Sequence, residues 1–262
     1  MFTITSAQLD ALLLAYTFPM VRVMSFLAAA PLFNNVAIPR RVKLIVALAV
    51  GFAITSALPP QNLAAPGSDV GLAILGMQIL IGAGMGFAMR VVFAALDVAG
   101  ELIGLQMGLS FATFFDPQSQ SQTSVVAEII GIVVSLLFLA LNGHLMLIQV
   151  LIRSFEWLPI SANPVHAEGW LLLARSGAIV FATGLLLALP VVVALLITNI
   201  ALAVLTRAAP QLNLFAVGFP ITSTVGIAVI WLTLPTLANV LEQIFDQGFE
   251  GMALLVRVWT GT

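Results

Sequence analysis

Long apolar stretches alternate with short polar connections along this chain. A membrane-spanning helix needs about 20 apolar residues, so the second of the six stretches is short and the fifth is long. Pro190 lies near the middle of the fifth stretch, which leaves open one bent helix or two segments. The pattern predicts an all-α protein of membrane-type helical hairpins that forms one compact unit over 1–262. The six stretches lie at about 11–33, 42–58, 70–106, 125–152, 170–206 and 214–241.

Composition strengthens the prediction of a membrane protein. The chain is 61% hydrophobic and 8% charged, whereas an ordinary soluble domain has about 25% charged residues. This composition makes membrane lipid an expected partner, and the formal net charge of -2 offers no basic surface for nucleic acid. Residues 1–10 contain no Lys or Arg, and Arg22 interrupts the first apolar stretch. We therefore expect that stretch to be retained as a helix and not removed as a signal peptide.

Residues that could support catalysis do not form a recognisable site in the sequence. Neither His144 nor His166 has a second ligand at metal-binding spacing. The glycines at 82–86 lack the third glycine of a dinucleotide fingerprint, because Phe87 occupies that position. No G-x-S-x-G nucleophile motif is present. The sequence therefore predicts no enzyme, no cofactor and no metal site.

Glycines recur at four-residue spacing in and just after the third apolar stretch. Gly82 and Gly86 form one such set, and Gly100, Gly104 and Gly108 form another. Small residues at this spacing let another helix approach closely. Contacts within the chain and contacts with another subunit both remain open.

Ionisable residues within the apolar stretches form a second candidate group. A charge at the bilayer centre costs about 3 kcal/mol and usually faces protein or water. Asp97 and Glu101 lie four residues apart on one helical face, and Arg90 lies two turns earlier. A proton relay and a set of buried ion pairs are both open, and we favour ion pairs because no further acids continue a pathway. We expect Asp97 or Glu101 to pair with Arg22 or Arg90.

The segment 107–124, MGLSFATFFDPQSQSQTS, is the most distinctive part of the chain. It is too polar for contact with lipid, yet it carries Phe111, Phe114 and Phe115. Irregular backbone at membrane depth must line a cavity or be covered by protein. A surface loop is one interpretation. The other, which we favour, is a movable aromatic constriction in a pore.

Four motifs resemble those of the FliR family of type III export-gate subunits, which has relatives in virulence secretion. They are IPRRVK at 38–43, GELIGLQMGLSFATFFDP at 100–117, NGHL at 142–145 and APQLNLFAVGFP at 209–220. The resemblance implies a structural and gating subunit of the flagellar export gate, which passes unfolded flagellar substrates. It implies FliP, FliQ and FlhB as partners, and a location in the bacterial inner membrane at the flagellar basal body. Family members pack in a helical pore assembly whose helices can lie partly above the bilayer plane.

The resemblance also assigns roles to individual residues. The basic turn with Arg40, Arg41 and Lys43 resembles the part of the family that faces the cytoplasm. The segment 209–220 resembles a second family turn, to which we assign no role. The segment 104–123 resembles the family's pore plug, and the residues carried over to it are Gly104, Gly108, Ser110, Phe111, Phe114, Phe115, Asp116 and Pro117.

A small-solute or ion transporter of the inner membrane is the alternative function. Such a transporter is expected to bind its solute near the bilayer midplane through broken helices in paired repeats. Pro190 marks one helix break, and no counterpart is evident in the sequence. The gate subunit is therefore the preferred hypothesis.

Overall fold

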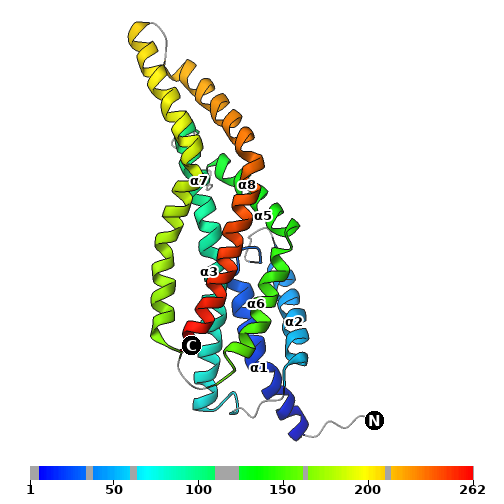
Figure 1. Cartoon of the computed structure of the whole chain (residues 1–262). Coiled ribbons are helices and arrows are strands. Elements are labelled where there is room, and N and C mark those ends of the chain that lie inside the picture. Colours follow the sequence, from blue (N-terminus) through cyan, green and yellow to red (C-terminus); the bar gives the residue numbers. More distant parts are fainter. Residues whose placement is uncertain are drawn as a thin grey trace. The chain divides into compact units, whose positions relative to one another are not determined.

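The computed structural model describes residues 6–33, 38–59, 64–109, 124–161, 165–209 and 214–261, except for the side chains of 6–14 and 214–216. These residues form helices and no strand, which confirms the predicted all-α class (Figure 1). The helices are α1 (Ser6–Ala29), α2 (Arg40–Ala57), α3 (Asp69–Met107), α5 (Val125–Ala140), α6 (Gly143–Trp157), α7 (Ala167–Ala208) and α8 (Leu214–Thr260).

The fourth apolar stretch forms two helices instead of one. Helices α5 and α6 meet at Asn142 and differ in direction by 65°. Asn142 has a φ of 58° in the left-handed region, which asparagine tolerates better than most residues. Asn142, Gly143 and His144 interrupt the apolar residues at this break, and an Asn-Gly pair is a turn signal that the reading of one continuous stretch passed over.

Proline does not divide the last two apolar stretches. Pro190 lies inside the continuous helix α7, and Pro220 and Pro235 lie inside α8. Residues 214–220 are therefore helical, which corrects the turn expected at 209–220 for this part of it. Helix α8 also continues through the tail to Thr260, well beyond the apolar stretch that ended near 241.

The described helices contribute to two compact units. The first unit comprises residues 1–90, 142–176 and 246–262, and the second comprises 91–141 and 177–245. Helices α3, α7 and α8 each contribute residues to both units. A single domain over 1–262 stays a prediction.

In the first unit, aromatic and long apolar side chains fill the core between α1, α3, α6 and the end of α8. Trp259 is almost completely buried, and its ring centroid lies 4.9 Å from that of Trp170. A Cβ atom on Gly84 would lie 2.6 Å from the Trp259 ring. Glycine at this position is therefore what allows the large indole to reach α3. Other fully buried members are Phe18, Phe26, Met85, Met89, Leu147 and Leu151.

Helix α3 approaches α1 through two of the glycines selected from the sequence. A Cβ on Gly86 would lie 2.7 Å from both Ala29 Cβ and Phe26 O. A Cβ on Gly82 would collide with Ser25 Oγ and Arg22 O. Both glycines thus serve contacts within the chain, which is one of the two alternatives that the sequence left open.

The second unit has an apolar core of its own, made by the remaining parts of α3, α7 and α8 together with α5. Phe93, Phe138 and Phe245 contact one another, with ring centroids 5.0–5.8 Å apart. Next to them along the helices is a second group, which begins at Ala99 on α3 and ends at Leu195 on α7. Its buried members are Ala99, Ile103, Met107, Val126, Ala188, Val191 and Leu195.

Much of the apolar surface of the described helices is not covered by the chain itself. Helices α3, α7 and α8 are long and apolar enough to cross a membrane, and the bent pair α5–α6 could provide one more span. Phe181 and Leu186 on α7 are each 70% exposed, and Trp231 on α8 is 72% exposed. Apolar surface of this extent requires lipid or protein around it.

Candidate functional site

The segment singled out from the sequence leaves α3 through a well-defined helix end. Gly108 has a φ of 81°, a conformation in which a side chain would be strained. Its N–H donates to Leu105 O at 3.1 Å, and the N–H of Leu109 donates to Gly104 O at 3.1 Å. This pair of bonds is the Schellman motif, which ends a helix and satisfies its last carbonyl groups. Gly108 therefore fixes the point at which the segment departs.

The segment returns to the same place at the start of α5. Ser124 is the N-cap residue, and its Oγ accepts a hydrogen bond from the N–H of Val126 at 3.3 Å. The N–H of Ser124 in turn donates to Glu101 Oε1 on α3 at 2.8 Å. Because a carboxylate is a strong acceptor, this bond joins the two ends of the segment. We call the residues at this junction, Glu101, Gly104, Met107, Ser124 and Thr222, the neck.

Small residues let α3 and α5 come together at the neck. A Cβ on Gly104 would collide with Ser124 Oγ, and one on Gly100 would lie 2.5 Å from Ala127 Cα. As α3 proceeds from 100 to 104, its contacts on α5 run from 127 back to 124, so the two helices are antiparallel here. Glycine at both positions is what allows the Glu101 carboxylate to reach the backbone of Ser124.

A third helix, α8, holds the last turn of α3. The hydroxyl of Thr222 donates to Met107 O at 3.0 Å, and both residues are buried. A Cβ on Gly226 would lie 2.7 Å from the Met107 side chain. The neck is therefore fixed by three helices of one unit.

Most of the aromatic and polar residues of the expected plug lie outside the described part of the chain. Gly104 and Gly108 are described and occupy the neck and the helix end. The residues outside the described ranges are Ser110, Phe111, Phe114, Phe115, Asp116 and Pro117.

Arg22 is fully buried and hydrogen-bonded to neutral oxygens. Its Nε donates to Gln78 Oε1 at 2.7 Å, its Nη1 to Ser154 O at 3.0 Å and its Nη2 to Leu158 O at 3.0 Å. The guanidinium also lies 4.3 Å from the centre of the Phe155 ring. Ser154 and Leu158 are at the carboxyl end of α6, where the helix dipole favours a positive charge. Arg22 thus links α1, α3 and α6 within the first unit.

The other charged residues selected from the sequence have different surroundings. Arg90 and Asp97 are exposed on α3, and Glu101 is half-buried at the neck. The contacts described for Arg22 and Glu101 are with Gln78, Ser154, Leu158 and Ser124, which sequence reasoning missed. A cationic partner for Asp97 or Glu101 stays a prediction.

The basic cluster lies in the first turn of α2 instead of in the preceding connection. Pro39 occupies the N-cap position, and Arg40 and Arg41 are exposed while Lys43 is half-buried. The helix dipole favours acidic residues at this end. Stability of the helix therefore does not explain these three positive charges.

We expect Glu101→Ala to release the amide of Ser124. A hydrogen bond to a charged acceptor contributes about 1.5–3 kcal/mol, so hydrogen exchange at this amide should speed up by about 10- to 150-fold. Glu101→Gln keeps a carbonyl acceptor and should cause a smaller increase. Glu242→Ala removes an exposed acid from the same unit and serves as the control. Equal exchange in all three variants would show that the bond does not hold the neck.

Comparison with known sequences identifies the family. Residues 13–248 match the family described as bacterial export proteins, family 1. The chain is 42% identical over 256 residues to the flagellar biosynthetic protein FliR of Escherichia coli (strain K12), covering 98% of each chain. It is 46% identical over 238 residues to FliR of Pectobacterium carotovorum, covering 91% of each. FliR of Aquifex aeolicus is 31% identical over 248 residues, covering 94% of each. These matches confirm the resemblance drawn from the motifs, and the chain belongs to family 1 of the bacterial export proteins.

Proposed function

We propose that this protein is a structural and gating subunit of the flagellar type III protein export gate. Membership of the family, with FliR proteins as end-to-end relatives, makes it a component of the flagellar export apparatus. The finer proposal is that the segment 104–123 seals a pore through which unfolded flagellar substrates pass. The role is not enzymatic, because the subunit provides a path and a barrier for the substrate.

The neck is the observation that carries the gating part of the proposal. The Glu101–Ser124 hydrogen bond fixes both ends of the segment, and the Gly108 helix end sets its direction of departure. A barrier in a channel must hold its position while the residues between its ends yield to a passing chain. Phe111, Phe114 and Phe115 provide the apolar bulk for closure, because hydrophobic constrictions exclude ions by dewetting.

We further propose that FliP, FliQ and FlhB are the partners, in the inner membrane at the flagellar basal body. The exposed apolar side chains of α7 and α8 support this proposal, since protein neighbours and lipid are the two ways to cover them. Helices of such an assembly can lie partly above the bilayer plane. In this arrangement Arg40, Arg41 and Lys43 face the cytoplasmic side, which accounts for positive charge at the unfavourable end of α2.

Purification tests the proposed assembly. We expect the chain expressed alone to aggregate in mild detergent, and the chain expressed with the other gate subunits to purify with them in fixed proportions. The physical reason is that uncovered apolar helices associate non-specifically when their proper neighbours are missing. Size-exclusion chromatography and mass determination provide the measurement. A monodisperse, protease-resistant monomer without partner subunits would contradict the proposal.

A further inference from the structure

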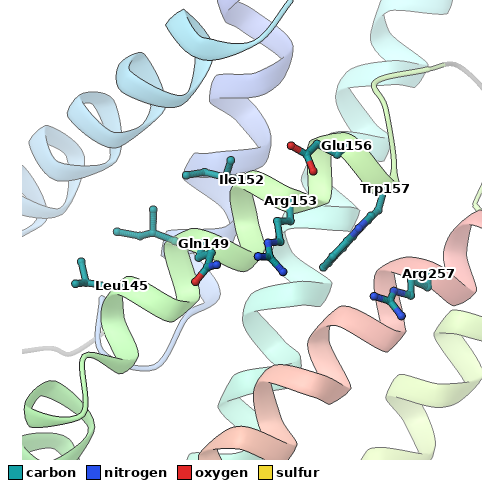
Figure 2. Close-up of a pocket in the computed structure, with 8 residues that line it drawn as sticks. Leu145, Gln149, Ile152, Arg153, Glu156, Trp157 and Arg257 are labelled. Carbon is teal, nitrogen blue, oxygen red and sulfur yellow. The ribbon is translucent and has the colours of Figure 1, made fainter.

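A pocket in the first unit brings together groups that the gate function does not use. It has a volume of about 660 Å³ and lies between α6 and the end of α8. Figure 2 shows the indole of Trp157 between the side chains of Arg153 and Arg257. The Arg257 Cζ lies 5.2 Å from the centre of the Trp157 ring. The lining residues are Leu145, Ile148, Gln149, Ile152, Arg153, Glu156, Trp157 and Arg257.

The two arginines have no acidic partner within the described part of the chain. No described carboxylate lies within 4.0 Å of either guanidinium, and Figure 2 shows the carboxylate of Glu156 turned away from both. Arg257 lies in the last turn of α8, where it complements the helix dipole. Arg153 is not in the last turn of α6, so the helix dipole does not explain its place in this pocket. Two exposed guanidinium groups in one pocket favour an anionic ligand.

Apolar side chains continue from the pocket toward the start of α6. Leu145 and Ile152 are exposed and line the same pocket. From Trp157 to Leu145 the helix rises about 18 Å, which is close to the roughly 15 Å depth of one hydrocarbon leaflet. Tryptophan is enriched where the hydrocarbon meets the headgroups. The groups along α6 are cationic and aromatic at one end and apolar at the other. Their order therefore matches the headgroup and acyl chain of a phospholipid.

We propose that this pocket binds an anionic phospholipid, with the headgroup phosphate contacting Arg153 and Arg257 at the edge of the Trp157 indole and an acyl chain along Ile152 and Leu145. Trp157 stacks with Arg257 and holds its guanidinium toward the phosphate. Free phosphate shares the headgroup chemistry but not the apolar contacts. The proposed lipid site is separate from the neck and does not depend on the gating proposal.

Lipid binding by the full chain, purified in detergent with its co-purifying subunits, tests the proposal. Phosphatidylglycerol is titrated against phosphatidylcholine, and bound lipid is counted by native mass spectrometry. One arginine near an anionic headgroup contributes about 1 kcal/mol, so Arg153→Gln or Arg257→Gln should weaken phosphatidylglycerol binding about 5-fold and the double variant about 25-fold. Arg153→Lys should retain most of the affinity. Arg175→Gln, which removes an exposed arginine outside the pocket, should change nothing.

Several outcomes would overturn the proposal. Equal binding of the two lipids would show that charge is not recognised. Displacement of phosphatidylglycerol by an equal concentration of inorganic phosphate would assign the site to phosphate instead of lipid. If the arginine variants lose a co-purifying subunit while their lipid binding is unchanged, the two arginines bind carboxylates of that subunit and not a lipid. Each variant must show the same helical circular dichroism as the wild type. If the variant with both Arg153→Gln and Arg257→Gln does not fold, Arg153→Lys combined with Arg257→Gln takes its place.

Discussion

Replacing Arg22 with methionine is expected to lower the thermal unfolding midpoint of the assembled protein by about 10 °C. Methionine keeps the length and packing of the side chain but removes every donor. Gln78 Oε1 and Leu158 O then lose the bonds that hold them to α1. Each buried acceptor left without a donor costs about 1–3 kcal/mol, and each kcal/mol corresponds to about 2–4 °C for a chain of this size. Thermal unfolding followed by circular dichroism measures the change.

Two further variants separate the loss of hydrogen bonds from the loss of charge. Arg22→Lys keeps the charge, but a single ammonium group cannot reach Gln78, Ser154 and Leu158 together, so an intermediate loss is expected. Arg22→Met combined with Gln78→Met removes the orphaned acceptor and should be less destabilising than the sum of the single changes. Arg175→Met serves as the control at an exposed position. Equal midpoints for Arg22→Met and Arg175→Met would refute the structural role of Arg22.

The partners of Arg22 illustrate what the sequence could not provide. A buried arginine predicts a compensating group, and opposite charges are the partners that spacing along one helix can suggest. The groups that compensate Arg22 are carbonyl and amide oxygens on α3 and α6, which carry no charge signal. Ser154 and Leu158 become suitable only because α6 ends beside α1, and that is a property of the fold.

The end of α8 was missed for a different reason, and a signal for it was present. Glu242, Asp246 and Glu250 lower the hydropathy of this region, but they recur every four residues and are all exposed. Phe245 and Trp259 lie on the buried side of the same helix. A search for helical periodicity instead of average hydropathy would have extended the helix past 241.

The all-α class and the long apolar helices could be predicted because composition and stretch length determine them directly. The neck could not be predicted, since Glu101 and Ser124 are 23 residues apart and their contact depends on how α5 returns along α3. The glycine spacing did indicate a close helix approach at Gly100 and Gly104. It could not identify α5 as the helix that approaches, because small-residue spacing carries no information about its partner.

Removing the aromatic bulk of the plug is expected to make the closed gate leak ions. Phe111→Ala with Phe114→Ala leaves the charge of the segment unchanged and leaves the neck contacts intact. Without apolar side chains a constriction stays hydrated, so small ions should pass. The assembled double variant should raise membrane ion conductance and the sensitivity of cells to ionic stress, while the amount of assembled complex stays at the wild-type level.

Deleting most of the segment should increase the leak further, provided that the neck is preserved. Helix α3 rises about 9 Å from Glu101 to Met107, and one linker residue spans about 3.3 Å. Replacing 110–123 by a Gly-Ser linker of about six residues therefore lets Ser124 keep its bond to Glu101. Phe87→Ala with Phe181→Ala removes two exposed phenylalanines from helices and should not leak, which controls for a general loss of aromatic surface. If the deletion variant assembles normally and the membrane remains as tight as with the wild type, the segment is a surface loop and the seal must lie elsewhere.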